Sequence, residues 1–279
     1  MIKKLIALIL WVLLSVNFSA VFAEADLKVR FLKTSDGIEL GVLGELKKND
    51  PSPTLIILAT TIQNTLGSEY YRHCGNQLLG HGYICVSINL PCHGNQRIDS
   101  EPEGLLGWNY RTARGLDFVT EFNRRLSASL DYLIEKGIAD PEKIAICGTS
   151  RGGFLALHGA IHDKRIKCVA AFSPVTDLFA LREFKSNIKQ ELINDINLLN
   201  HAKELARRRV WIVIGDRDKR VGTDHAIKLA REISKLSNNL KTTGKVQLHV
   251  LPEPRGHTVP DGADKMAAEW IVNELDRGV

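Results

Sequence analysis

The sequence predicts an α/β protein with a doubly wound, mostly parallel sheet that begins with an antiparallel hairpin. Short runs of almost continuously apolar residues recur along the chain, which is typical of strands buried on both faces. Longer amphipathic stretches separate these runs, and helices between consecutive strands favour parallel crossovers. The expected strands cover residues 54–60, 83–90, 143–147, 168–172, 210–214 and 246–251.

The remaining elements follow from local signals. Between residues 27 and 48, two extended segments flank Ser35-Asp36-Gly37, which is typical of a hairpin turn. Residues 177–208, between two expected strands, exceed the length of a simple crossover and are predicted to form two small helices that serve as a lid. No repeat or linker is evident, so residues 24–279 are predicted to be one domain. The expected helices cover residues 116–136, 153–162, 224–236 and 263–277.

The first 23 residues have the layout of a secretory signal peptide. Lys3 and Lys4 precede an apolar stretch, and small residues stand at Ala20 and Ala23, where a signal peptidase cleaves. The apolar stretch is short of the roughly 20 residues that a membrane-spanning helix needs. The sequence therefore predicts residues 1–23 to be cleaved, a periplasmic or secreted protein, and no stable membrane span afterwards.

Composition and charge exclude several classes of protein. The 279 residues are 44% hydrophobic and 25% charged, as in a packed globular protein rather than a disordered or multi-span membrane protein. The whole chain has 37 basic and 32 acidic residues, a formal charge of +5, of which the signal peptide contributes two lysines. So mild an excess, without a block of basic residues, does not favour a nucleic-acid partner.

The five cysteines suggest core residues rather than a metal site. Cys85, Cys147 and Cys168 lie inside apolar runs and are expected to be buried. Cys74 and Cys92 lie outside those runs. Because an exported protein enters an oxidising compartment, these two cysteines are the ones expected to form a disulfide. No Cys-x-x-Cys or Cys/His quartet is present, and no structural zinc is expected.

A glycine-rich turn carries the main chemical signal. Gly148-Thr149-Ser150-Arg151-Gly152 stands between an expected buried strand and an expected helix. It lacks the Lys of a phosphate-binding loop and the spacing of a dinucleotide fingerprint, but it matches G-x-S-x-G, the nucleophile elbow. Its glycines remove the Cβ atoms that would clash where the chain reverses. Ser150 is then held above the sheet at the start of a helix.

A serine nucleophile needs a base and an acid that orients that base. In this type of fold the three follow in the order Ser, Asp or Glu, His, each after a strand. Asp218 follows the strand at 210–214, and His257 precedes the last helix. The alternatives for the acid are Asp216 and Asp177, and those for the base are His249, His158 and His162.

With these residues in place, residues 27–277 resemble the α/β-hydrolase superfamily, in particular the branch of dienelactone hydrolases and prolyl oligopeptidase catalytic domains. The resemblance implies Ser150 as nucleophile, Asp218 as acid and His257 as base, with no metal or organic cofactor. It rests on the segment 140–153 (DPEKIAICGTSRGG), Gly215-x-x-Asp218-x-x-Val221 and Gly256-His257, and Asn89-Leu90-Pro91-Cys92-His93-Gly94 resembles the loop after the family's fourth strand.

The sequence departs from this pattern at the oxyanion hole. One donor is expected to be the N–H of Arg151, and the other comes from the loop after the strand at 54–60. Many relatives have His-Gly in that loop, whereas this chain has Thr60-Thr61. The N–H of Thr61 is the first choice and that of Thr60 the second. Loss of one such donor typically lowers the rate about 10²- to 10³-fold.

The function expected from these residues is that of an exported serine hydrolase acting on carboxylic esters through an acyl-enzyme. One alternative is a peptidase of the prolyl oligopeptidase type acting on short peptides, and another is a non-catalytic binding protein on a hydrolase fold. The partner is then a small ester or short peptide, and the oligomeric state is left open. Trp108, Tyr110, Arg111 and Arg114 either border the pocket, favouring an acidic or aromatic group, or only pack and solvate their loop.

Overall fold

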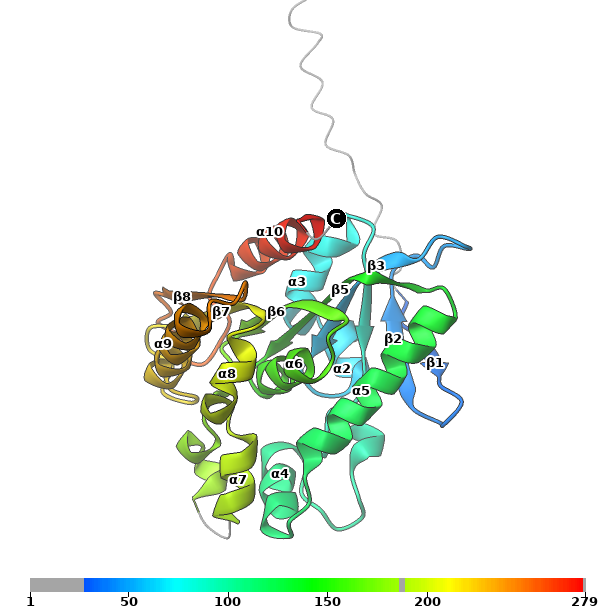
Figure 1. Cartoon of the computed structure of the whole chain (residues 1–279). Helices are drawn as coiled ribbons and strands as arrows, with labels where there is room; N and C mark the ends of the chain where they lie inside the picture. Colours follow the sequence, from blue (N-terminus) through cyan, green and yellow to red (C-terminus); the bar gives the residue numbers. More distant parts are fainter. Residues whose placement is uncertain (1–27, 186–188, 278–279) are drawn as a thin grey trace, which may run out of the picture.

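Eight strands of the described residues form one sheet in the order β1-β2-β4-β3-β5-β6-β7-β8 (Figure 1). The structure is a computed structural model that describes residues 28–185 and 189–277. The expected signal peptide therefore lies outside the described residues. The strands are β1 Arg30–Lys33, β2 Glu39–Leu43, β3 Ser52–Leu58, β4 Ile84–Ser87, β5 Ala139–Thr149, β6 Ile166–Phe172, β7 Arg209–Gly215 and β8 Lys245–Leu251.

The predicted hairpin and the parallel sheet are both confirmed. β1 and β2 pair antiparallel around a turn in which Gly37 has φ +86°, a conformation that glycine adopts without strain. β2 also pairs antiparallel with β4. The remaining pairs, in the order β4-β3-β5-β6-β7-β8, are all parallel. Because the parallel strands all point the same way, the loops after β3, β5, β7 and β8 meet at one edge of the sheet.

Helices cover both faces of the sheet, which is why its strands are apolar throughout. Along β3, Leu55 and Ile57 pack on the face covered by α2, α3 and α10, whereas Ile56 and Leu58 pack on the face covered by α5, α6 and α9. Figure 1 shows these two helical layers. The helices on the two faces are α2 Ile62–Gly67, α3 Glu69–Leu79, α10 Ala263–Asp276, α5 Phe118–Glu135, α6 Arg151–His162 and α9 Thr223–Leu240.

Three helices were not anticipated from the sequence. They are α2 and α3, between β3 and β4, and α4 (Gly104–Ala113), before α5. α2 has six residues, too few to show a periodic pattern, and α4 contains two glycines, which lower helix propensity. α2 and α3 pack in the core on one side of the sheet, and α4 packs in the core on the other side.

The segment predicted to form a lid consists of short helical turns. It contains two short α-helices, as predicted: α7 Gln190–Ile196 and α8 Ala202–Leu205. It also contains three 3-10 turns, which are η2 Leu178–Ala180, η3 Arg182–Phe184 and η4 Leu198–His201. In Figure 1, α7 and α4 lie at the same end of the molecule. Service as a lid stays a prediction.

The expected disulfide is wrong for this structure. The described cysteines are all free and buried. Cys74 lies in the core on the α3 and α10 side of the sheet, whereas Cys92 lies in the core on the opposite side. The sheet itself separates the two thiols, which the sequence could not show.

None of the described helices combines the length and apolar character needed to cross a bilayer.

Candidate active site

Ser150 stands at a strained turn between β5 and α6. Its φ is +55°, a region that residues other than glycine rarely occupy. A Cβ on Gly148 would lie 2.2 Å from the carbonyl oxygen of Gly152, and one on Gly152 would lie 1.9 Å from that of Leu58. The glycines of the G-x-S-x-G motif are therefore required by backbone contacts, as the sequence predicted.

The structure brings Ser150, His257 and Asp218 together in a hydrogen-bonded series. His257 Nε2 lies 2.9 Å from Ser150 Oγ, and His257 Nδ1 lies 2.7 Å from Asp218 Oδ2. The three side chains come from the loops after β5, β8 and β7, which meet at the carboxyl edge of the sheet. Residues up to 107 positions apart thus form one connected unit.

Asp218 is buried, with 3% of its surface exposed, and is held as a carboxylate. Burial raises its pKa, but hydrogen bonds from His257 and from the backbone N–H groups of Arg220 and Val221 outweigh that effect and lower the pKa below its usual value. Asp216 instead accepts from the N–H of Glu253, and Asp177 lies 3.1 Å from His225. Of the three candidate acids, Asp218 is the one that reaches His257.

The other candidate histidines lie elsewhere. His158 is buried in α6 and donates from Nε2 to the carbonyl of Ile196, and burial lowers its pKa to about 3. His249 lies in β8, where its ring packs against Trp211 and burial lowers its pKa. His162 is the last residue of α6.

Two neighbours fix the loop that carries His257. Ser173, which follows β6, donates from Oγ to the carbonyl of Thr258 at 2.8 Å. The hydroxyl of Tyr70, from α3, lies 3.2 Å from Thr258 Oγ1 and accepts from the N–H of Val259 at 3.3 Å. The imidazole of His257 is therefore positioned both by these contacts to the neighbouring loop residues and by its hydrogen bond to Asp218.

A cavity of about 190 Å³ opens beside Ser150. It is small, its lining is polar and apolar in similar measure, and it joins the loops after β3, β5, β6 and β8 to the start of α3. Its lining consists of Ala59, Thr60, Tyr70, Tyr71, Thr149, Ser150, Arg151, Ser173, His257 and Thr258.

The predicted oxyanion donors lie at this cavity in part. Arg151 is the first residue of α6, and both Arg151 and Thr60 line the cavity. The N–H of Thr60 is donated to Thr65 Oγ1 at 3.1 Å. Thr61 caps α2, where its Oγ1 accepts from the N–H of Asn64 at 3.1 Å. The choice between Thr61 and Thr60 as second donor stays a prediction.

The residues proposed to border the pocket pack away from it. Trp108 donates from Nε1 to the carbonyl of Pro91 at 2.9 Å and stacks on Phe118. Arg111 forms a 2.7 Å ion pair with the buried Glu101, and Arg114 lies over the ring of Tyr110. The packing interpretation is therefore the one that the structure supports.

Sequence reasoning assigned no role to three residues that lie at the cavity or contact Arg151. Tyr70 and Tyr71 come from a helix that the hydrophobic pattern did not reveal. His93 lies in the segment Asn89 to Gly94, which was singled out only by resemblance, and its Nε2 lies 3.0 Å from Nη1 of Arg151. Ser68 at the N-cap position, followed by Glu69 in the first turn, was the available signal for the helix.

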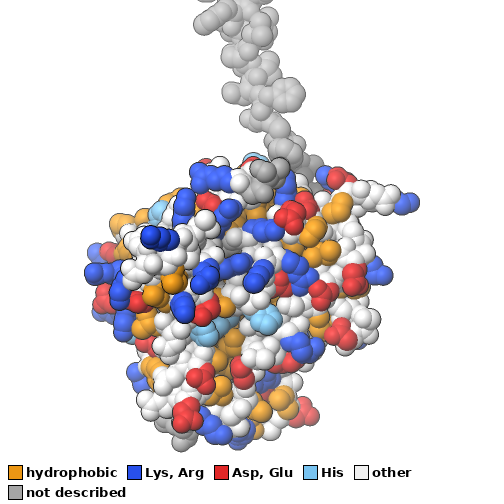
Figure 2. Space-filling view, viewed as in Figure 1, with side chains coloured by type: hydrophobic (Ala, Val, Ile, Leu, Met, Phe, Trp, Pro, Cys, Tyr) orange, Lys and Arg blue, Asp and Glu red, His pale blue; other side chains and the backbone are white. Residues whose placement is uncertain are grey.

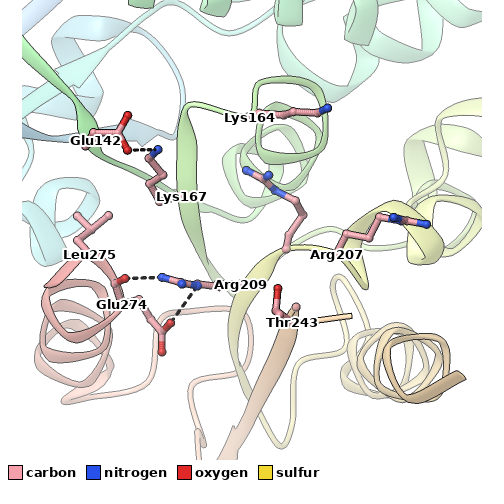
Figure 3. Close-up of a pocket in the computed structure, with 10 residues that line it drawn as sticks. Glu142, Lys164, Lys167, Arg207, Arg209, Thr243, Glu274 and Leu275 are labelled. Carbon is pink, nitrogen blue, oxygen red and sulfur yellow. Dashed lines mark hydrogen bonds and ion pairs between the residues drawn. The ribbon is translucent and has the colours of Figure 1, made fainter. Parts of the chain in front are cut away.

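A second cavity, of about 280 Å³, opens at the opposite edge of the sheet, where β6, β7 and β8 begin (Figure 3). Its charged groups are mostly cations, two of which form ion pairs: Lys167 with Glu142 at 2.8 Å and Arg209 with Glu274 at 3.4 Å. In Figure 2, Lys and Arg side chains gather over the upper part of the molecule, which holds α10. The cavity is lined by Glu142, Lys164, Lys167, Arg207, Arg208, Arg209, Thr243, Gly244, Glu274 and Leu275.

Comparison with known proteins places the chain among hydrolases. The model of the prolyl oligopeptidase family matches residues 106–275, more than half of the chain. A 20-hydroxy-prefusarin hydrolase from Gibberella moniliformis is 30% identical over 132 residues, which are 47% of this chain and 29% of that protein.

Solved structures show the same fold at low identity. Porphyromonas gingivalis dipeptidyl peptidase 4 matches with a TM-score of 0.65 and 14% identity over 88% of this chain and 35% of that one. An esterase from Pyrococcus furiosus matches with a TM-score of 0.57 and 17% identity over 90% of this chain and 91% of that one. The chain thus spans a minor part of the peptidase but nearly the whole of the esterase.

Proposed function

We infer the function of this chain from its family. The chain belongs to the prolyl oligopeptidase family, whose members are serine hydrolases on an α/β-hydrolase fold. On that premise, we propose an exported serine hydrolase that cleaves carboxylic esters, with Ser150 as nucleophile, His257 as general base and Asp218 as its orienting acid.

The hydrogen-bonded series from Ser150 to Asp218 carries the proposal. A serine hydroxyl becomes a good nucleophile only when a base accepts its proton as it attacks. His257 Nε2, 2.9 Å from Ser150 Oγ, is within reach of that proton. Asp218 accepts from Nδ1, which leaves Nε2 as the basic nitrogen and stabilises the imidazolium as it forms.

The carbonyl under attack becomes an oxyanion, which needs donors of its own. The N–H of Arg151, at the start of α6, is the first, and the helix N-terminus adds a partial positive charge. Thr61, or Thr60 in its place, supplies the second from the loop after β3. His257 next protonates the leaving alcohol and then activates a water molecule, which releases the acid and restores Ser150.

Ester hydrolysis is favoured over peptide hydrolysis by two observations. The cavity of about 190 Å³ suits a small acyl group, and the chain aligns with nearly the full length of an esterase. Peptidase activity is the second candidate, because dipeptidyl peptidase 4 shares the fold. We expect p-nitrophenyl acyl esters to be hydrolysed faster than aminoacyl or prolyl p-nitroanilides. Faster hydrolysis of the anilides would reverse this order.

A fluorophosphonate probe tests the nucleophile directly. We expect the wild-type protein to be labelled and Ser150→Ala to be unlabelled, because the probe reacts only with an activated serine. An unlabelled wild type, or equal labelling of the variant, would leave the non-catalytic binding protein as the better hypothesis.

Export is proposed from the first 23 residues alone. We expect the full gene, expressed in a Gram-negative host, to yield periplasmic protein that begins at Glu24. N-terminal sequencing reads the cut directly, and cytoplasmic protein that retains Met1 would contradict export.

A further inference from the structure

The side chain of Arg151 makes a contact that is separate from the proposed role of its backbone N–H at the oxyanion hole. Its guanidinium extends from the first turn of α6 to His93, where Nη1 lies 3.0 Å from Nε2. The Nδ1 of His93 is 2.9 Å from the carbonyl of Pro91 and donates to it, so Nε2 is the unprotonated nitrogen and accepts from Arg151. Burial lowers the pKa of His93, which keeps the ring neutral. The charge of Arg151 is therefore not balanced by this contact.

No carboxylate of the described residues forms an ion pair with Arg151. Glu183 pairs instead with Arg220 at 2.6 Å. Glu103 is exposed at the start of α4. Both acids are close enough to favour the charged form of Arg151, but burial and Arg220 act against it, and burial has the larger effect, so its pKa is lowered.

A glycine lets the guanidinium pack closely against the start of α4. Gly104 has φ +67°, and a Cβ at this position would lie 2.6 Å from Nη1 of Arg151. Tyr71, which lines the cavity with Arg151 and Ser150, is also close enough to influence the charge on Arg151. Among the described residues, the guanidinium hydrogen-bonds only to His93, so a half-buried cation with further N–H donors stands one residue from the nucleophile.

Buried cations are usually paired, because removing a charge from water is costly unless an opposite charge replaces the water. The planar fork of Arg matches the two oxygens of a carboxylate and binds them through parallel hydrogen bonds. We propose that the Arg151 side chain forms a carboxylate-binding subsite, so that the preferred substrates of the proposed esterase are esters that carry a free carboxylate.

This proposal rests on the proposed function, and it gives Arg151 two roles, one for its backbone and one for its side chain. The N–H of Arg151 faces the oxyanion, whereas its side chain holds a carboxylate several bonds from the reacting carbon. The small cavity restricts the substrate to a short chain between the two groups. That carboxylate can belong to the acyl group or to the leaving alcohol, and the experiment below separates the two.

The test compares matched esters on the wild-type protein. The first pair is monomethyl glutarate and the methyl ester of glutaramic acid, which differ only by carboxylate against carboxamide in the acyl group. The second pair is O-acetyl glycolate and O-acetyl glycolamide, which differ in the leaving group. We expect kcat/KM to favour the carboxylate by about 10- to 100-fold in one pair, as a charge-assisted bond to a single ligand group would give.

Variants assign that preference to the guanidinium. In Arg151→Met, the ratio of carboxylate to carboxamide rates is expected to fall to about one, and in Arg151→Lys to an intermediate value, because a point charge replaces the fork. His93→Leu, which removes the positioning contact, is expected to lower the ratio partly. Arg207→Ala, in the second cavity, removes a cation of the same type and is expected to keep the wild-type ratio.

A measurement without variants covers the case in which Arg151→Met does not fold. Free glutarate is expected to inhibit wild-type hydrolysis of a neutral ester competitively, and glutaramate with its single carboxylate less strongly, whereas glutaramide is expected not to inhibit. Neutral-ester hydrolysis with equal rates in both pairs and no inhibition by glutarate would overturn the subsite and leave the esterase standing. Absence of all hydrolysis and of fluorophosphonate labelling would overturn the proposed function itself.

Discussion

The two cavities at opposite edges of the sheet differ in how their charged groups are held. The cavity at Ser150 is the smaller, about 190 Å³ against about 280 Å³, yet its polar side chains form one connected series across three loops. The second cavity, called the basic cavity from here on because most of its charged groups are cations, contains more charges. Its ion pairs, such as Lys167 with Glu142, are separate from one another. Connection between side chains, and not cavity size or charge, therefore distinguishes the candidate active site.

Burial explains why this difference matters for chemistry. Asp218 is buried and receives hydrogen bonds from two backbone N–H groups and His257, so its orientation does not depend on solvent. Glu142 has 74% of its side chain exposed, and exposed pairs of this kind contribute about 0–1 kcal/mol. Groups at the Ser150 cavity are preorganised, whereas the exposed pair of Lys167 and Glu142 at the second cavity is free to exchange partners with water.

The largest effect is expected from Ser150→Ala. Without the hydroxyl no acyl-enzyme can form, and we expect kcat/KM for a p-nitrophenyl ester to fall about 10⁴- to 10⁶-fold. The matched control is Arg207→Ala in the basic cavity, which is expected to retain wild-type kcat/KM. Equal losses in the two variants would remove the distinction between the cavities.

Asp218→Asn is expected to lower kcat by about 10⁴-fold, because an amide can donate to Nδ1 and so favours the wrong imidazole tautomer. Steady-state kinetics with the same ester measures this loss. Asp216→Asn serves as the control, since Asp216 contacts the N–H of Glu253 instead of His257. A larger loss in Asp216→Asn would mean that the orienting acid has been misassigned.

Gly152→Ala tests the backbone geometry of the elbow. The added Cβ would meet the carbonyl oxygen of Leu58 at 1.9 Å, and since both partners are backbone, neither can move cheaply. We expect the free energy of unfolding to fall by about 3 kcal/mol in urea titrations. Gly67→Ala, which meets no atom within 4 Å, is expected to leave stability unchanged or slightly improved.

Acid pH is expected to destabilise the protein through His73, whose ring packs against Phe172. Burial lowers the pKa of His73 to about 4, and both ring nitrogens are buried without a hydrogen-bond partner among the described residues. The unfolded chain then binds more protons than the native one between pH 6.5 and about 4, so the free energy of unfolding falls as pH falls through that window.

The slope contributed by His73 is at most about 1.4 kcal/mol per pH unit. Urea titrations across this range are expected to show a shallower slope for His73→Leu than for the wild type. An unchanged slope in His73→Leu would mean that the ring is already protonated in the native state.

The smallest effect is expected in the basic cavity. Glu274 contacts Arg209 at 3.4 Å and Arg277 at 3.2 Å, and both arginine side chains are partly exposed. Glu274 itself is buried, but the isosteric Gln can still accept a hydrogen bond from each arginine, so Glu274→Gln is expected to lower the free energy of unfolding by about 1 kcal/mol, with no change in kcat/KM. A large loss of activity in this variant would mean that the two cavities are coupled.

Much of the fold could be predicted because it depends on patterns along the chain. The six parallel strands and four of the helices followed from apolar runs and amphipathic stretches, and the elbow followed from Gly148, Ser150 and Gly152. Local patterns failed where elements were short or polar, as in α2 and α3. The segment that holds Tyr70 and Tyr71 was therefore not recognised as part of the site.

Sequence alone determined which residue types were available and the order Ser150, Asp218, His257, because a parallel sheet brings the loops after its strands to one edge. Tertiary structure decided the rest. It selected Asp218 over Asp216, separated Cys74 from Cys92 by the sheet, and brought His93 to the guanidinium of Arg151. Those outcomes depend on register, helix packing and side-chain direction across distant segments, which no pattern along a single chain records.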